Sequence, residues 1–168
     1  MDTEEYLDLV DEDDKVIGRM LRSELHAKGL HNYRVINAFV INKAGKLWIP
    51  RRTAHKSLFP LALDISAAGH VASGETYEET FRREVQEELN VDIDTVPYRF
   101  LGALTPKDGV HAFEHIWELQ MEDVPNYNRD DFVEYFWFSP KELFEKLKAG
   151  DEAKSDLPKL VEIFYGKN

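Results

Sequence analysis

The segment from Thr76 to Leu89 carries the strongest helix signal in the chain and restricts the folds that are open to it. Thr76 followed three residues later by a glutamate is a capping-box pattern, so the helix is predicted to begin there. Tyr77, Phe81 and Val85 recur with Leu89 every four residues and form one apolar stripe. A helix with one apolar stripe has to bury it against another layer of structure. Several predicted strands joined by hairpin-length turns supply that layer, so the sequence favours an α/β fold with a mixed sheet.

Apolar runs separated by turn residues predict the strands before and after this helix. Four aromatic residues within them, Phe39, Trp48, Phe113 and Trp117, are expected in the core rather than on a binding surface. The expected elements are a hairpin at 6–10 and 15–20 turned by residues 12–14, a short helix capped by Ser23 and stopped at Gly29, strands at 35–41, 46–50, 99–104, 110–120 and 132–138, an irregular basic loop at 51–63, a short apolar stretch at 64–68, and helices from Ser139 and over 157–165.

The length and composition of the chain predict a single domain. With 168 residues, of which 43% are hydrophobic and 12% aromatic, the chain is long enough to bury one sizeable core. Residues 1–34 are expected to form a hairpin and helix extension, and residues 35–168 the core with its C-terminal helices. The chain has no cysteine, which excludes a disulfide framework, a thiolate metal site and a cysteine nucleophile.

The net charge of the chain limits the classes of molecule that it can bind. A formal net charge of −11 argues against polymeric nucleic acid or an anionic membrane as a partner, because both require a basic face. A small phosphorylated ligand is compatible with it, since a few local Arg and Lys residues suffice. The N-terminal segment lacks the apolar core of a signal peptide, and no apolar run approaches the ~20 residues that span a bilayer. We therefore expect a cytoplasmic protein, and a homodimer is compatible with the sequence.

Three acidic residues, Glu84, Glu87 and Glu88, crowd one side of the predicted helix at positions i, i+3 and i+4. Like charges at this spacing destabilise a helix by roughly 0.2–0.5 kcal/mol per pair. Two interpretations are open: a solvated acidic face, or a site for a divalent cation. Oxygen anions on a rigid helix suit Mg²⁺ or Mn²⁺, and the loop beginning at Gly69 can bring a backbone carbonyl close to them.

The spacing of residues 69–91 resembles the signature of the Nudix hydrolases. The signature runs Gly, five residues, Glu, seven residues, Arg-Glu-aliphatic-x-Glu-Glu-x-Gly-aliphatic, and only its last glycine is replaced, by Asn90. The resemblance implies an α/β/α sandwich, and cleavage of a nucleoside or other organic diphosphate linked to a further group. It implies that Glu84, Glu87 and Glu88 serve as metal ligands or base, with the Gly69 carbonyl as a further ligand. The matching residues are Gly69, Glu75, Arg83, Glu84, Val85, Glu87, Glu88 and Val91.

Other segments resemble the type I isopentenyl diphosphate isomerase branch of the same superfamily. These are residues 51–56 with Phe59-Pro60, the pair Gly69-His70, and residues 131–137. The isomerase chemistry needs a cysteine where this chain has Ala68, and of its Glu-x-Glu pair only Glu114 is present. Metal-dependent hydrolysis is therefore favoured. An isomerase-like enzyme and a catalytically silent Nudix binding module are the alternatives.

The resemblance places further site residues outside the signature. Arg52 and Lys56 are the expected phosphate contacts, because a guanidinium and an ammonium both bind phosphate oxygens. Asp131 is a candidate general base beside the helix acids Glu84 and Glu87. Glu114 is a candidate further metal ligand, with a salt bridge as the alternative. Glu75 is expected to brace Arg83, and the three histidines His70, His111 and His115 are expected in structural or rim positions.

Overall fold

The computed structural model describes residues 4–167. The chain forms eight strands and four α-helices within this range, with two short 3₁₀ turns at 93–95 and 106–108. In chain order they are β1 (Tyr6–Val10), β2 (Val16–Leu21), α1 (Arg22–Ala27), β3 (Arg34–Ile41), β4 (Leu47–Arg52), β5 (Ala67–His70), α2 (Tyr77–Leu89), β6 (Tyr98–Leu104), β7 (Phe113–Gln120), β8 (Phe132–Phe138), α3 (Pro140–Lys148) and α4 (Leu157–Tyr165).

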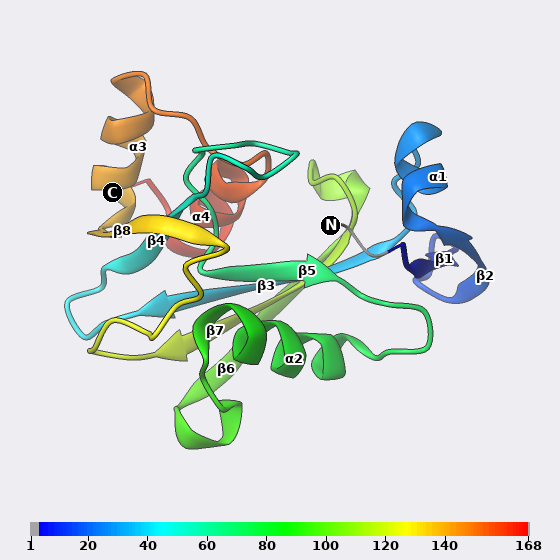
Figure 1. Ribbon diagram of the computed structural model, residues 1–168, viewed down its shortest axis with the longest axis horizontal. Helices are drawn as coiled ribbons and strands as arrows, with labels where there is room; N and C mark the ends of the chain where they lie inside the picture. Colours follow the sequence, from blue (N-terminus) through cyan, green and yellow to red (C-terminus); the bar gives the residue numbers. More distant parts are fainter. Residues whose placement is uncertain (1–3, 168) are drawn as a thin grey trace.

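The central sheet is mixed, as predicted. Its strand order is β6-β7-β3-β4-β8, with β5 paired to β3 as well. β3 and β7 run parallel, whereas the other pairs are antiparallel. Helix α2 covers one face of the sheet, and α3 and α4 lie on the other (Figure 1). The layers form the expected α/β/α sandwich.

The hydrophobic core has one half on each face of the sheet, because successive side chains along β3 point to opposite faces. Ile36, Ala38 and Val40 face α2 and pack with its apolar stripe, including Phe81 and Val85. The intervening Phe39 faces the opposite side and packs with residues of α3 and α4. The four aromatic residues expected in the core, Phe39, Trp48, Phe113 and Trp117, are all buried.

The ends of α2 follow the sequence signals. The Thr76 hydroxyl accepts from the Glu79 backbone N–H, and the Glu79 carboxylate accepts from the Thr76 backbone N–H. Asn90 ends the helix in the left-handed region at φ 53°. Asparagine tolerates this conformation better than other non-glycine residues, so its replacement of the signature glycine leaves the helix end intact.

Three expectations about local structure were wrong. Ser23 does not cap α1, because the helix already begins at Arg22 and the Ser23 hydroxyl donates to Glu4. The stretch from Ala67 to His70 is strand β5, so Gly69 lies in the sheet rather than in a loop. Strand β4 continues to Arg52, since it pairs with β8 beyond Pro50.

The N-terminal hairpin and α1 pack against one end of the sheet. Leu7 and Leu25 are fully buried and form a small core with Tyr33 of the segment before β3. Asp8 accepts from the Ser73 hydroxyl at 2.6 Å and from the Gly74 backbone N–H at 3.1 Å. The hairpin is thereby attached to the loop that leads into α2. No helix within residues 4–167 is both long and apolar enough to cross a membrane.

Candidate active site

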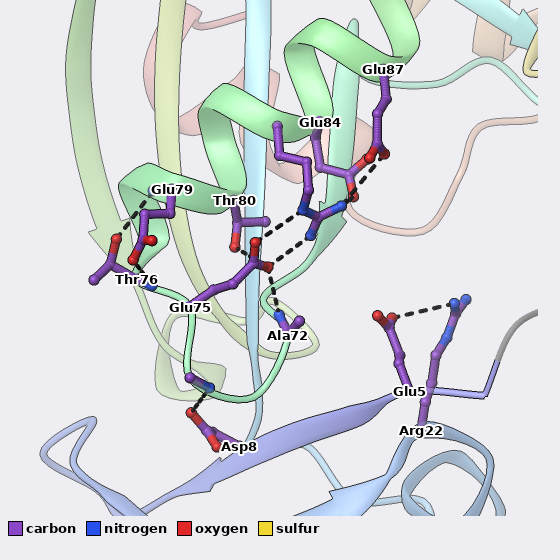
Figure 2. A network of polar contacts seen from close by, with 12 residues as sticks. Glu5, Asp8, Arg22, Ala72, Glu75, Thr76, Glu79, Thr80, Glu84 and Glu87 are labelled. Atoms are coloured by element: carbon purple, nitrogen blue, oxygen red, sulfur yellow. Dashed lines mark hydrogen bonds and ion pairs between the residues drawn. The ribbon is translucent and has the colours of Figure 1, made fainter.

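Glu75 and Arg83 form a brace at the start of α2. Two Arg83 nitrogens donate to the Glu75 carboxylate at 3.0 and 2.8 Å, and the Thr80 hydroxyl donates to it at 3.0 Å. Figure 2 shows Glu75 beneath the first turns of the helix, with Glu84 and Glu87 farther along it. Arg83 lowers the pKa of Glu75, chiefly through these hydrogen bonds. Glu75 is therefore occupied in positioning Arg83, as expected.

Arg83 also reaches the acids of the helix. Its Nη1 donates to Glu84 at 2.9 Å and to Glu87 at 3.4 Å. The side chain of Glu84 is 15% exposed and that of Glu87 is 57% exposed. The brace thus fixes one acid near the sheet, while the other lies at the solvent-facing edge of the site.

Glu84 and Glu88 lie together in a partly buried position, and among residues 4–167 Arg83 forms an ion pair with Glu84 but no ion pair is made by Glu88. Burial raises the pKa of Glu84 despite its contact with Arg83. Burial raises the pKa of Glu88 well above its ordinary value, and the neighbouring Glu84, Asp64 and Asp131 raise it further. A divalent cation would neutralise this group, and carboxylate oxygens are the donors that Mg²⁺ and Mn²⁺ prefer. The donor set therefore fits the expected metal.

Gly69 lies directly against these acids. Strand β5 pairs Gly69 with Ile36 of β3, and the Ala68 backbone N–H donates to Glu88 at 3.4 Å. A Cβ atom added at Gly69 would overlap the carboxyl group of Glu84. The signature glycine is thus required by the close approach of the strand to the helix.

Basic residues surround the acids in a cavity of about 550 Å³. Arg52 donates to Asp64 at 2.8 Å, and Lys56 donates to Asp131 at 2.8 Å. The structure therefore brings both expected phosphate contacts and the candidate base to the helix acids. Lys154 also lines the cavity; it follows α3 in the chain and lies 3.8 Å from Asp64.

Arg22, at the start of α1, lines the same cavity and pairs with Glu5 at 3.7 Å. Figure 2 shows this pair at the open end of the N-terminal hairpin, on the side of the helix that carries Glu84 and Glu87. Sequence reasoning missed Arg22 and Lys154. Neither belongs to a motif, and the tertiary fold alone brings them to the cavity.

Arg51 and Arg52 are adjacent but have different environments. Successive side chains along β4 point to opposite faces, so Arg51 points away from Arg52. Its guanidinium donates two hydrogen bonds of 2.9 Å to Asp151 and a further one to Glu134. These contacts raise the pKa of Arg51. Arg51 therefore links β4 to β8 and the segment after α3, and Arg52 is the arginine of this pair that faces the acids.

The structure does not bring Glu114 to the helix acids. Glu114 pairs with Val35 across β7 and β3, on the face of the sheet away from α2. Its side chain accepts from Asn37 at 2.8 Å and lies near His111 and Asp156. A shift of one residue along a strand exchanges the two faces, which is why the sequence alone could not place this acid.

A second cavity of about 370 Å³ adjoins the first. The two share Arg22, Arg52, Lys154, and the β5 residues Ala68, Gly69 and His70. Much of its lining is apolar or aromatic, and the Tyr33 and His70 rings are stacked in its wall at 5.6 Å. Burial lowers the pKa of His70 well below its ordinary value, so its ring is neutral.

The chain is similar to known proteins over most of its length. The family model of the NUDIX domain matches residues 31–160. The chain is 55% identical over 162 residues to the Nudix hydrolase all7351 of Nostoc, covering 96% of each chain. It is 46% identical to the crystal structure of DR0079 from Deinococcus radiodurans, with a TM-score of 0.90, covering 96% of this chain and 99% of that one. It is also 28% identical over 152 residues to an isopentenyl-diphosphate Delta-isomerase of Salmonella typhi, covering 88% of this chain and 84% of the isomerase.

The fold and the helix acids define a Nudix enzyme, and the chain belongs to the Nudix hydrolase family. Its resemblance to the isomerase branch is confirmed at a lower level of identity.

Proposed function

We propose that this protein is a metal-dependent hydrolase that cleaves an organic diphosphate by attack of water on phosphorus. One observation carries the proposal: the partly buried acids Glu84 and Glu88 share a cavity with Arg52, Lys56 and Lys154. Two adjacent acids, of which only Glu84 is paired with an arginine, suit a divalent metal, and basic residues beside them suit phosphate oxygens. In a chain with a net charge of −11, a local basic site is needed to attract an anionic substrate.

The metal would be Mg²⁺ or Mn²⁺, held by Glu84, Glu87 and Glu88 with the carbonyl of Gly69. When bound, such an ion lowers the pKa of a coordinated water and neutralises charge on the phosphoryl group. The proposed role of Arg83 and Glu75 is to keep the Glu84 carboxylate oriented toward Gly69. The resulting products are a monophosphate and a second phosphorylated fragment, or orthophosphate.

Arg52 and Lys56 are proposed to hold the phosphate oxygens and to stabilise the charge that develops there. Both are paired with carboxylates in the structure, Arg52 with Asp64 and Lys56 with Asp131. A bound diphosphate that pairs with the Lys56 ammonium would break the ion pair between Lys56 and Asp131. The freed carboxylate is then a candidate to accept the proton of the attacking water, as is a carboxylate of the helix. The group attached to the diphosphate would occupy the adjoining cavity beside Tyr33 and His70.

A substrate panel tests the proposal. Purified protein with millimolar Mg²⁺ or Mn²⁺ is incubated with ADP-ribose, dinucleoside polyphosphates, oxidised nucleotides and thiamine diphosphate, and products are read by phosphate release after phosphatase coupling. We expect metal-dependent cleavage of at least one substrate, abolished by chelator. Absence of turnover across the panel with both metals would support a silent binding module instead.

An isomerase-like activity is the second candidate, favoured by the similarity to the Salmonella typhi isomerase. Ala68 stands at the position of the required cysteine, and Ala112 replaces one acid of the Glu-x-Glu pair, so that only Glu114 is present. We therefore expect no deuterium exchange into isopentenyl diphosphate by NMR. Clear metal-dependent exchange would identify the isomerase-like function.

Truncation of Arg52 to Ala is expected to lower kcat/KM for every diphosphate substrate. A charge-assisted contact of about 1.5–3 kcal/mol corresponds to roughly a ten- to hundredfold loss. KM should rise, and kcat should also fall if the contact tightens in the transition state. Arg99→Ala is the matched control, because Arg99 is 70% exposed and pairs with Glu118 away from the cavity. Unchanged kcat/KM in folded Arg52→Ala protein would place the phosphate contact elsewhere.

A further inference from the structure

A second cluster of metal-ligating side chains lies on the opposite face of the sheet from α2. His111 precedes β7, Glu114 lies within it, and Asp156 directly precedes α4. Each side chain offers one ligand atom, and the three atoms all lie within 4.8 Å of one another. His111 and Asp156 line the cavity of about 370 Å³, so the cluster is accessible from that side.

Glu114 has an oxygen that the rest of the described chain leaves unsatisfied. The residue is fully buried, and its Oε1 accepts from the Asn37 amide at 2.8 Å. Its Oε2 has no hydrogen-bond partner among residues 4–167 and lies 3.3 Å from the Nδ1 of His111. Burial raises the pKa of Glu114 to about 9, and the neighbouring Asp156 adds to the shift. A divalent cation bound beside this carboxyl group would stabilise its charged form.

The Asp156 side chain also points toward the cluster and does not cap helix α4. It occupies the N-cap position of α4, yet its side chain makes no capping hydrogen bond. Its carboxylate accepts from the His111 backbone N–H at 3.2 Å and contacts the Nδ1 of the same residue. Because an aspartate at this position ordinarily caps the helix, its diversion is a second sign that the cluster has a use of its own.

We propose that His111, Glu114 and Asp156 bind a divalent transition-metal ion of the Zn²⁺ or Mn²⁺ type, at a site separate from the acids of α2. One imidazole and two carboxylates suit such an ion better than Mg²⁺, which prefers oxygen alone. Zinc bonds to nitrogen and oxygen are about 2.0–2.2 Å long, and tetrahedral angles then separate two ligand atoms by about 3.3–3.5 Å. The 3.3 Å between the Nδ1 of His111 and the Oε2 of Glu114 meets that requirement. The Nδ1 of His111 is in direct contact with Asp156, so these two groups would move apart to admit the ion. Asn37 would fix the orientation of Glu114 from behind.

Binding of Co²⁺ tests this site in the full chain. The double variant Glu84→Gln, Glu88→Gln removes two of the three helix acids and leaves the second cluster intact. After removal of metal by chelator, we expect this variant to bind one equivalent of Co²⁺ with visible d–d absorption. Zn²⁺ should displace the Co²⁺, and excess Mg²⁺ should not. Loss of all Co²⁺ binding in the double variant would overturn the proposal.

Substitutions within the cluster identify the ligands. In the same background, His111→Asn and Glu114→Gln are each expected to weaken Co²⁺ binding at least about tenfold, since even outer-shell partners of metals matter by that much. His55→Asn is the matched control, because His55 is exposed and lies outside the cluster. Near-UV circular dichroism reports whether each variant is folded. Co²⁺ affinity that survives both substitutions would show that the three residues form only a hydrogen-bonded cluster.

A measurement on the unsubstituted protein keeps the test independent of variant folding. Histidine side-chain NMR during titration with Zn²⁺, with excess Mg²⁺ present, should show a shift of the His111 Nδ1 resonance at one equivalent. If that resonance is unchanged at saturating Zn²⁺, the proposal is wrong.

Discussion

Glu88→Gln is expected to lower kcat/KM by at least about a hundredfold while the protein remains folded. Mutation of outer-shell partners of a metal costs about ten- to hundredfold, so loss of a direct ligand should cost at least as much. Glu88 is the most strongly perturbed acid of the helix, with Glu84, Asp64 and Asp131 around it. Steady-state kinetics at several Mg²⁺ concentrations measure the effect. Glu78→Gln is the matched control, because Glu78 lies on the same helix and its side chain is 61% exposed.

The same substitution should stabilise the metal-free protein near neutral pH. The folded-state pKa of Glu88 is raised, so ionisation of this residue opposes folding once the pH exceeds its unfolded value of about 4.3. The gain from Gln should be present at pH 7 and disappear at pH values below that unfolded pKa, where Glu88 is protonated in both states. Thermal unfolding in chelator at the two pH values checks this sign. Full turnover in Glu88→Gln would show that Glu88 is not a required ligand.

Gly69→Ala is expected to reduce activity by about a hundredfold with a much smaller effect on folding. The added methyl group would overlap the Glu84 carboxyl group, which is the flexible end of a side chain and can move aside. A displacement of about 1 Å at a reacting site can cost a factor of about a hundred. Activity and thermal unfolding are measured on the same preparation, and the metal dependence should shift to higher concentration.

Gly18→Ala serves as the control for the glycine substitution, because a Cβ at Gly18 meets no atom within 4 Å. Equal activity of Gly69→Ala and the unsubstituted protein would mean that the position of Glu84 does not limit the reaction. A large loss of stability without a change in metal dependence would assign the glycine to packing alone.

Local sequence determined the elements whose signals are short-range. The capping box at Thr76, the left-handed end at Asn90 and the Ser139 cap are confirmed, because each depends on backbone groups a few residues apart. The spacing of the acids on α2 and the Glu75–Arg83 brace were also predictable, since a helix fixes which residues share a face. The family followed from that spacing.

Tertiary structure alone decided which distant residues join the site. Arg22 and Lys154 reach the cavity from opposite ends of the chain, and no local pattern marks either of them. Strand β5 is short, and it is a strand because it pairs with β3. The local sequence therefore did not reveal that Gly69 lies in the sheet. The side of the sheet that Glu114 faces depends on strand register, and it joins His111 and Asp156 there. Register and long-range pairing are set by packing of the whole sheet, which is the physical reason that a linear pattern of residues did not contain them.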